Sequence, residues 1–152
     1  MRHLGVNNNF QWYNILKRDL SLSIEGVLGD KMKIFDLIAT STFGLEAIVR
    51  REVEDIGYEI KEVSDGKITY TADAEGIILS NLWLRSADRV LLKMGEFKAT
   101  TFEELFNQTN QLPWEKWITA DGKFTVTGKS VKSGLFSVSD CQAIVKKSIV
   151  DP

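Results

Sequence analysis

The order of hydrophobic periods between residues 34 and 94 restricts the fold of this chain more than any other feature of its sequence. Four short segments are apolar or alternate with period two, as strands do: 34–39, 58–63, 67–71 and 90–94. Two longer segments repeat apolar residues at helical spacing: 45–56 and 77–89. Turn residues separate several of these segments, at Gly57, Asp65-Gly66 and Gly95. The predicted order is strand, helix, strand, strand, helix, strand.

This βαββαβ order is that of a ferredoxin-like α+β fold. We expect N-terminal caps at Ser41-Thr42 for the first helix and at Asp73 for the second, because their side-chain oxygens can accept hydrogen bonds from free amides. The second helix is expected to lead directly into the last strand and to bury one stripe: Leu79, Leu82, Trp83, Ser86 and Val90. The fold hosts enzymes, regulatory modules and RNA binders, so it assigns no function by itself.

Three charged residues, Arg85, Asp88 and Arg89, fall away from that stripe. Because Asp88 is three residues from one arginine and adjacent to the other, it could join both guanidinium groups in an ionic network. Two guanidinium groups held in this way could bind a phosphate. The alternative is a solvated, charged junction between the helix and the strand.

The chain changes in character after Gly95. Thr101 and Glu104 form a predicted capping box for a helix that Pro113 interrupts, and three apolar anchors should follow: Trp114, Trp117 and Ile118. A strand is predicted over 123–128, with Phe124 and Val126 on one face. Since one strand cannot close a sheet, we expect this second unit to be incomplete where the sequence stops.

The final helix is predicted from a second capping box at Ser139 and Gln142. Its inward stripe should contain Cys141, Ile144, Val145, Ser148 and Ile149. Four lysines outside that stripe could converge beside the helix N-terminus and contact a polyanion: Lys129, Lys132, Lys146 and Lys147. The alternative is a plain solvated loop. The segment 128–130 is not a nucleotide-binding P-loop, because the glycine spacing is wrong.

Composition excludes several classes of site. The formal net charge is −2, so nucleic-acid binding would need a local patch of basic residues. Cys141 is the only cysteine and His3 the only histidine, which excludes a disulfide framework, a Cys/His metal set and a histidine base within the core. Packing is the expected role of Cys141 rather than nucleophilic catalysis. No membrane-length apolar run or signal sequence occurs, so we expect a reducing, cytoplasmic location.

Three parts are expected along the chain: an N-terminal extension over 1–32, the ferredoxin-like domain over 33–99 and a further domain over 100–152. The extension shows no sustained period. Met32 stands directly before the first convincing strand, so translation could begin there in the native gene. The alternative is a genuine helix over 14–22.

Five segments together resemble the bacterial THUMP-containing RNA methyltransferases, the enzymes similar to the 23S rRNA guanine-N2 methyltransferase: Ala39–Glu46, Asn81–Val90, Thr101–Phe106, Lys129–Ser133 and Gln142–Lys147. The likeness covers Lys33 to Asp151 in order and at the family's spacing. It implies a ferredoxin-like module followed by a truncated THUMP domain, which in the family grips structured RNA for a separate Rossmann-like catalytic domain. That domain uses S-adenosylmethionine and an Asn-Pro-Pro-type motif.

Neither the Gly-rich cofactor loop nor the Asn-Pro-Pro-type motif occurs in this sequence. The resemblance therefore carries over no catalytic or cofactor residue, and whether this chain is itself an enzyme stays open. It implies that the partner is structured RNA, 23S rRNA in particular, with a methyltransferase domain in cis or in trans. The expected RNA contacts are Lys129, Ser130, Lys132, Ser133, Lys146 and Lys147, with Arg85 and Arg89 added from the charged junction.

Two other functions remain open. The first is a stand-alone ferredoxin-like interaction or regulatory module that uses the region of Trp114 and Trp117 as an apolar surface. The second is an acylphosphatase-type enzyme, which shares the element order. That activity needs an arginine in the loop after the first strand, and residues 40–44 contain none.

Overall fold

The computed structural model describes residues 9–14, 33–128, 135 and 137–151. They belong to two compact units, one formed by Leu16–Lys93 and the other by Met1–Ile15 with Met94–Pro152. Residues 15–22 of the alternative N-terminal helix and the loop 129–134 lie outside the described residues. None of the helices within these ranges is long and apolar enough to span a membrane.

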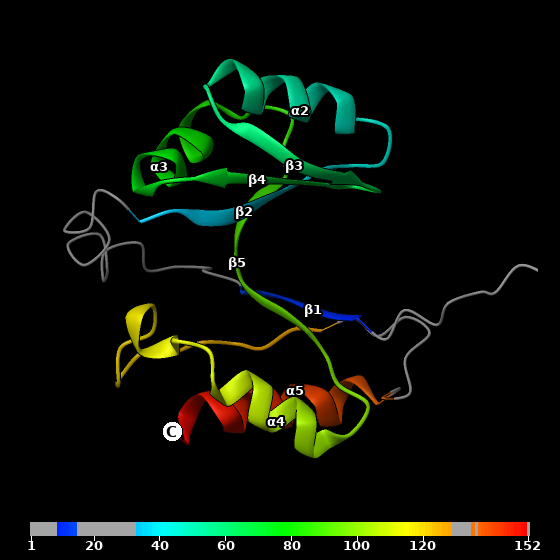
Figure 1. The fold of residues 1–152 in the computed structure, drawn as a ribbon, viewed down its shortest axis with the longest axis vertical. Helices are drawn as coiled ribbons and strands as arrows, with labels where there is room; N and C mark the ends of the chain where they lie inside the picture. Colours follow the sequence, from blue (N-terminus) through cyan, green and yellow to red (C-terminus); the bar gives the residue numbers. More distant parts are fainter. Residues whose placement is uncertain (1–8, 15–32, 129–134, 136, 152) are drawn as a thin grey trace, which may run out of the picture. The chain divides into compact units, whose positions relative to one another are not determined.

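The Leu16–Lys93 unit has the predicted ferredoxin-like architecture. Its strands are β2 (Phe35–Thr40), β3 (Glu59–Ser64), β4 (Lys67–Ala72) and the first part of β5 (Arg89–Lys98). They are antiparallel and hydrogen-bonded in the order β3-β4-β2-β5. Helices α2 (Glu46–Asp55) and α3 (Ala74–Trp83) cover the same face of this sheet (Figure 1). The βαββαβ prediction is confirmed.

The core of this unit lies between the sheet and its two helices. Buried strand residues pair across the register of β2 and β4, Leu37 with Tyr70 and Ala39 with Ile68. Residues opposite each other in a register point to the same face, so these pairs line the side that the helices cover. α2 adds Val49 and Val53, one turn apart and fully buried, as its apolar period predicted.

The start of α2 differs from the prediction. Ser41 and Thr42 do not cap it, because the helix begins at Glu46 and no side chain caps its first amides. The turn before it contains Gly44 at a φ of 93°, a left-handed conformation that favours glycine. The Glu46 carboxylate accepts hydrogen bonds from the amides of Gly44 and Gly66, both at 2.8 Å. Gly66 lies 20 residues away in the β3–β4 turn, so a local cap rule could not predict this contact.

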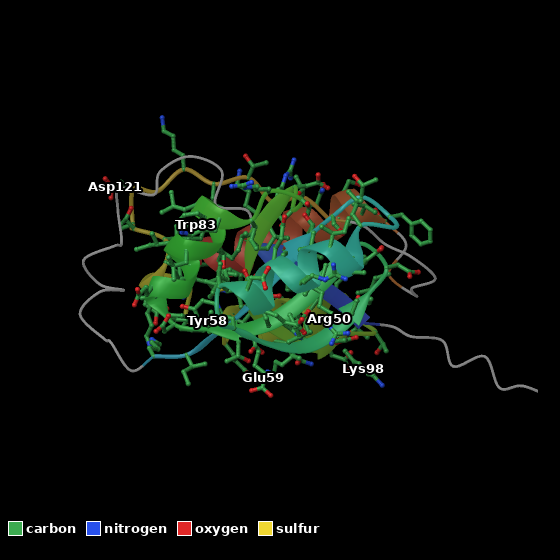
Figure 2. All side chains as sticks on the ribbon, turned by 90° about the horizontal axis from the view of Figure 1, so that it is seen from above. Arg50, Tyr58, Glu59, Trp83, Lys98 and Asp121 are labelled. Atoms are coloured by element: carbon green, nitrogen blue, oxygen red, sulfur yellow. The ribbon has the colours of Figure 1, made fainter. Side chains whose placement is uncertain are left out.

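The α3 helix has the predicted cap but buries a different face. The Asp73 carboxylate accepts a hydrogen bond from the Gly76 amide at 2.8 Å. The buried residues are small: Ala74, Gly76 and Ser80. Leu82 and Trp83 are 71% and 57% exposed, and Trp83 is labelled at the end of α3 in Figure 2. The prediction that these two side chains are buried is wrong.

A close approach of α3 to its neighbours explains this difference. A Cβ at Gly76 would stand 2.5 Å from the Cβ of Ala72 and 2.6 Å from Cζ of Tyr58. In the core, the Tyr70 hydroxyl donates to Oγ of Ser80 at 2.7 Å. The hydrophobic pattern predicted that the largest side chains of this helix are buried. The short distance between α3 and its neighbours leaves room only for small side chains. The helix also ends before a loop over 84–88, so the predicted direct junction with β5 is wrong.

The second unit contains α4 (Phe102–Asn110), the 3₁₀ turn η1 (Trp114–Lys116) and α5 (Val138–Val150). Helices α4 and α5 pack side by side (Figure 1). The buried cluster consists of Ala99, Leu105, Leu135, Cys141 and Val145. Strand β1 (Asn9–Asn14) is a neighbour of β5 in the sheet. The N-terminal extension therefore contributes a strand that the sequence pattern did not predict.

The two capping boxes were predicted with unequal accuracy. In α4, the Thr101 hydroxyl accepts from the Glu104 amide at 3.2 Å, and the Glu104 carboxylate accepts from the amides of Thr100 and Thr101. This box is confirmed. In α5 the cap is Ser137, two residues before the expected Ser139, and its hydroxyl accepts from the Asp140 amide. A serine stands at both positions, so the pattern alone did not separate them.

The segment 123–128 is not a strand. Among the described residues, its backbone pairs with no other strand of the sheet. An alternating pattern does not form a β-strand without such a partner. The alternation itself is present, since Phe124 and Val126 are less exposed than their neighbours and Val126 packs against the buried cluster. The period identified the inward face but not a hydrogen-bonded partner.

We expect Gly76→Ala to destabilise the chain by about 1 kcal/mol. Alanine gains about 1 kcal/mol in helix propensity, but overpacking costs about 1–3 kcal/mol, and here a new methyl group meets Ala72 and the Tyr58 ring. Urea unfolding should show a lower midpoint. Asn81→Ala, at an exposed position of the same helix, is the matched control. A gain in stability for Gly76→Ala would show that the close approach does not exist.

We expect Glu104→Gln to lose stability near neutral pH but to approach the wild type in acid. Hydrogen bonds from the Thr100 amide, the Thr100 hydroxyl and the Thr101 amide lower the pKa of Glu104 below 4.5. A lowered folded-state pKa contributes stability that is present above the unfolded pKa and is lost as pH falls through the folded pKa. Thermal midpoints across pH would test this, with Glu103→Gln as control. A difference that persists unchanged in acid contradicts it.

Candidate nucleic-acid interface

Helix α5 presents the predicted lysine pair. Its inward residues Cys141, Val145 and Ser148 are buried at spacings of four and three residues, as predicted. Lys146 and Lys147 are exposed on the remaining surface of the helix. Within the described part of the chain, no ion pair neutralises either ammonium group. Two adjacent positive charges therefore stand uncompensated on a packed helix.

The C-terminal end of α5 is fixed by Asn110 of α4. The side-chain amide of Asn110 donates to the carbonyl of Ser148 at 2.9 Å and to that of Asp151 at 2.8 Å. The last carbonyls of a helix lack partners within it, so this contact satisfies groups that are otherwise open. Lys147 lies in that last turn, where the helix dipole favours a positive charge.

Only part of the predicted contact set can be placed. Lys129, Ser130, Lys132 and Ser133 lie outside the described residues. Lys146 and Lys147 stand eight and nine residues beyond Val138, and at 1.5 Å per residue the first is about 12 Å along the helix axis from that residue. The expected convergence beside the helix N-terminus is therefore not found for these two lysines, which lie in the C-terminal half of α5.

The predicted arginine pair occupies a loop and a strand rather than a helix face. α3 ends at Trp83, so Arg85 belongs to the loop that follows and Arg89 begins β5; both are exposed. Asp88 forms no ion pair with either arginine in the described structure, so the predicted ionic network is wrong. The Asp88 amide instead donates to the Thr40 carbonyl at 2.7 Å.

Glu52 of α2, which sequence analysis missed, holds the same loop. Its carboxylate accepts hydrogen bonds from the amides of Arg85 and Ser86, both at 3.1 Å, and from the Ser86 hydroxyl at 3.0 Å. In the sequence Glu52 is one of several charged residues on the polar face of a helix. The contact spans 33 and 34 residues, so no spacing rule could have identified it.

Cys141 has a packing role. It is fully buried, and burial together with the neighbouring Asp140 carboxylate raises the pKa of its thiol. A catalytic cysteine needs the opposite shift, toward the thiolate. Among the described residues, no group of three or more His, Cys, Asp or Glu side chains could hold a metal ion.

Trp114 is an internal anchor, as predicted. It is 7% exposed, and its indole Nε1 donates to the Thr109 carbonyl at 2.6 Å. Trp117 and Ile118 are partly buried beside it in the sequence. The buried indole of Trp114 is not available for the apolar partner surface that the interaction-module alternative placed here.

Two family models match the chain, one in each half. The RlmL ferredoxin-like domain matches residues 36–91, and the THUMP domain matches residues 99–152. The first match runs from the second residue of β2 through α2, β3, β4 and α3 into the start of β5, the elements of the ferredoxin-like topology. The second covers α4 and α5, including Lys146 and Lys147.

Relatives of known name agree with these models. The Bacillus subtilis (strain 168) protein named "Putative RNA methyltransferase YpsC" is 53% identical over 120 residues, which is 79% of this chain and 31% of that protein. The Pseudomonas putida (strain GB-1) protein named "Ribosomal RNA large subunit methyltransferase K/L" is 30% identical over 117 residues, which is 77% of this chain and 16% of that protein.

A solved structure from Listeria monocytogenes str. 4b F2365, titled as a "predicted N6-adenine-specific DNA methylase", superposes with a TM-score of 0.77. It is 54% identical and covers 82% of this chain and 33% of its own. The chain thus spans about a third or less of the length of these three relatives. The chain carries an RlmL-type ferredoxin-like domain followed by a THUMP domain, and in this part it is similar to proteins named as RNA methyltransferases.

Proposed function

We propose that this chain is the RNA-binding portion of a ribosomal RNA methyltransferase and holds structured RNA for a catalytic domain that modifies it. The observation that carries the proposal is the THUMP match over 99–152, within which α5 presents Lys146 and Lys147 without ion-pair partners in the described structure. The expected substrate is 23S rRNA, and the expected product is a guanine methylated at N2. The large-subunit rRNA name of one relative supports the first expectation. The second rests on the sequence resemblance alone.

RNA affinity in this chain has to come from local charge. The formal net charge of −2 gives no attraction to a polyanion at long range. Phosphate contacts depend on individual lysines and arginines that release counterions on binding. Lys146 and Lys147 meet this requirement, and we propose Lys129, Ser130, Lys132 and Ser133 of the preceding loop as further contacts.

The methyl donor of such enzymes is S-adenosylmethionine. The sequence contains neither the Gly-rich cofactor loop nor the Asn-Pro-Pro-type motif that the resemblance leads us to expect of the catalytic domain. We therefore place methyl transfer, with its cofactor, on a catalytic domain in cis or in trans and assign no catalytic residue here.

A second candidate function is a ferredoxin-like interaction module without a catalytic role. The exposed Leu82 and Trp83 side chains at the end of α3 favour it, because apolar surface of this kind often marks a protein contact. Self-association on a sizing column that is insensitive to salt, together with an absence of RNA binding, would support this candidate over the first.

We expect the double substitution Lys146→Glu with Lys147→Glu to weaken binding to a folded fragment of large-subunit rRNA. Losing two phosphate contacts should reduce the slope of log affinity against log salt by about two, roughly one for each lysine. Fluorescence anisotropy between about 50 and 200 mM salt measures both the affinity and the slope.

The matched control is Lys98→Glu with Lys123→Glu, which makes the same change in charge at two exposed lysines of the same unit. An equal loss in this control would show that total charge rather than the α5 pair determines affinity. A DNA duplex of the same sequence belongs in the same titration. Equal affinity for that duplex would contradict recognition of RNA.

A further inference from the structure

The loop between α3 and β5 is held at two points. Near its start, the amides of Arg85 and Ser86 and the Ser86 hydroxyl all donate to the Glu52 carboxylate, at 3.0–3.1 Å. At its end, the Asp88 amide donates to the Thr40 carbonyl at 2.7 Å. The backbone that carries Arg85 is thus fixed from both sides, although its side chain is exposed.

The Glu52 carboxylate accepts hydrogen bonds from the loop at Arg85 and Ser86, but it does not pair with the Arg85 guanidinium. Its Oε2 accepts from the amides of Arg85 and Ser86 and its Oε1 from the Ser86 hydroxyl, and no ion pair joins Glu52 to the Arg85 guanidinium within the described residues. An exposed arginine in a loop usually loses conformational entropy when it binds a ligand. Fixing its backbone in advance lowers that cost, and leaving the guanidinium unpaired keeps it available to a phosphate.

We propose that Glu52 is a positioning residue that holds Arg85 for contact with an RNA phosphate, which places a second RNA-contacting surface on the ferredoxin-like domain. This inference rests on the proposed RNA-binding function. A purely structural loop contact is the competing explanation. The two differ in a measurable way, because Glu52 is itself negatively charged.

Electrostatics alone and a positioning role predict opposite changes in RNA affinity when this carboxylate is removed. Deleting a negative charge near an RNA surface should strengthen binding if charge alone matters. If Glu52 positions Arg85, Glu52→Ala should weaken binding despite the more favourable charge. Glu52→Gln should retain most of the affinity, because its amide oxygen can still accept from the Arg85 and Ser86 amides.

The experiment is a double-mutant cycle on the full chain, with a folded rRNA fragment as the probe. Arg85→Ala should lower affinity about tenfold, as expected for one charge-assisted contact, and Glu52→Ala should lower it about three- to tenfold. In the Arg85→Ala background, Glu52→Ala should cause no further loss. Faster amide exchange at Arg85 and Ser86 in Glu52→Ala would report the released loop directly.

Glu54→Ala is the matched control, since Glu54 lies on the same helix, carries the same charge and pairs only with Arg50 in the described structure (Arg50 is labelled in Figure 2). It should leave loop exchange unchanged and not weaken binding. Unchanged or stronger binding in Glu52→Ala, or equal losses in both backgrounds, overturns the positioning role. If the wild type binds no structured RNA, the proposed function falls and this inference with it. Wild-type binding with no loss in Arg85→Ala overturns the inference alone.

Discussion

Two carboxylates of α2 hold the turns and loops that leave the ferredoxin-like sheet, and the surface of this unit depends on them. Glu46 binds the amides of Gly44 and Gly66, which ties the β2–α2 turn to the β3–β4 hairpin. Hydrogen bonds from its own backbone amide and from the amide of Gly66 lower the pKa of Glu46, so the ionised acceptor persists at neutral pH. Glu52, about two turns along, binds the loop before β5. Because hydrogen bonds to an ionised acceptor are stronger than neutral ones, one helix orders segments that are remote in the sequence.

In the ferredoxin-like unit, the close packing of α3 determines which of its side chains are exposed. Gly76 and Ser80 admit α3 close to Tyr58 and Tyr70, and a helix held this way cannot also bury large side chains on that side. Leu82 and Trp83 are therefore exposed although they are among the most hydrophobic residues of the helix. The buried positions of α3 are occupied by small residues, and these two large side chains lie outside that set.

The periodic pattern of the sequence correctly predicted the features that depend on residues close to one another in the chain. The element order of the sheet, the Asp73 cap, the Thr101 capping box and the inward stripe of α5 all follow from spacings of two to four residues. The failures involve partners far away in the sequence. The strand expected over 123–128 forms no ladder in the described structure, and β1 pairs with β5 although its own sequence lacks a clear period. Hydrophobicity also could not show that α3 packs too closely for leucine or tryptophan.

For the same reason, only part of the candidate RNA surface could be predicted from the sequence. Exposure of Lys146 and Lys147 follows from the helical period of α5, whereas the role of Glu52 depends on a contact more than 30 residues away. That contact also bears on how a chain of net charge −2 can bind a polyanion. Glu46, Glu52 and Glu104 accept backbone amides, and no ion pair joins any of them to a cation within the described residues. The lysines of α5 and the guanidinium of Arg85 also have no ion-pair partner there, so local attraction to phosphate does not depend on the overall balance of charge.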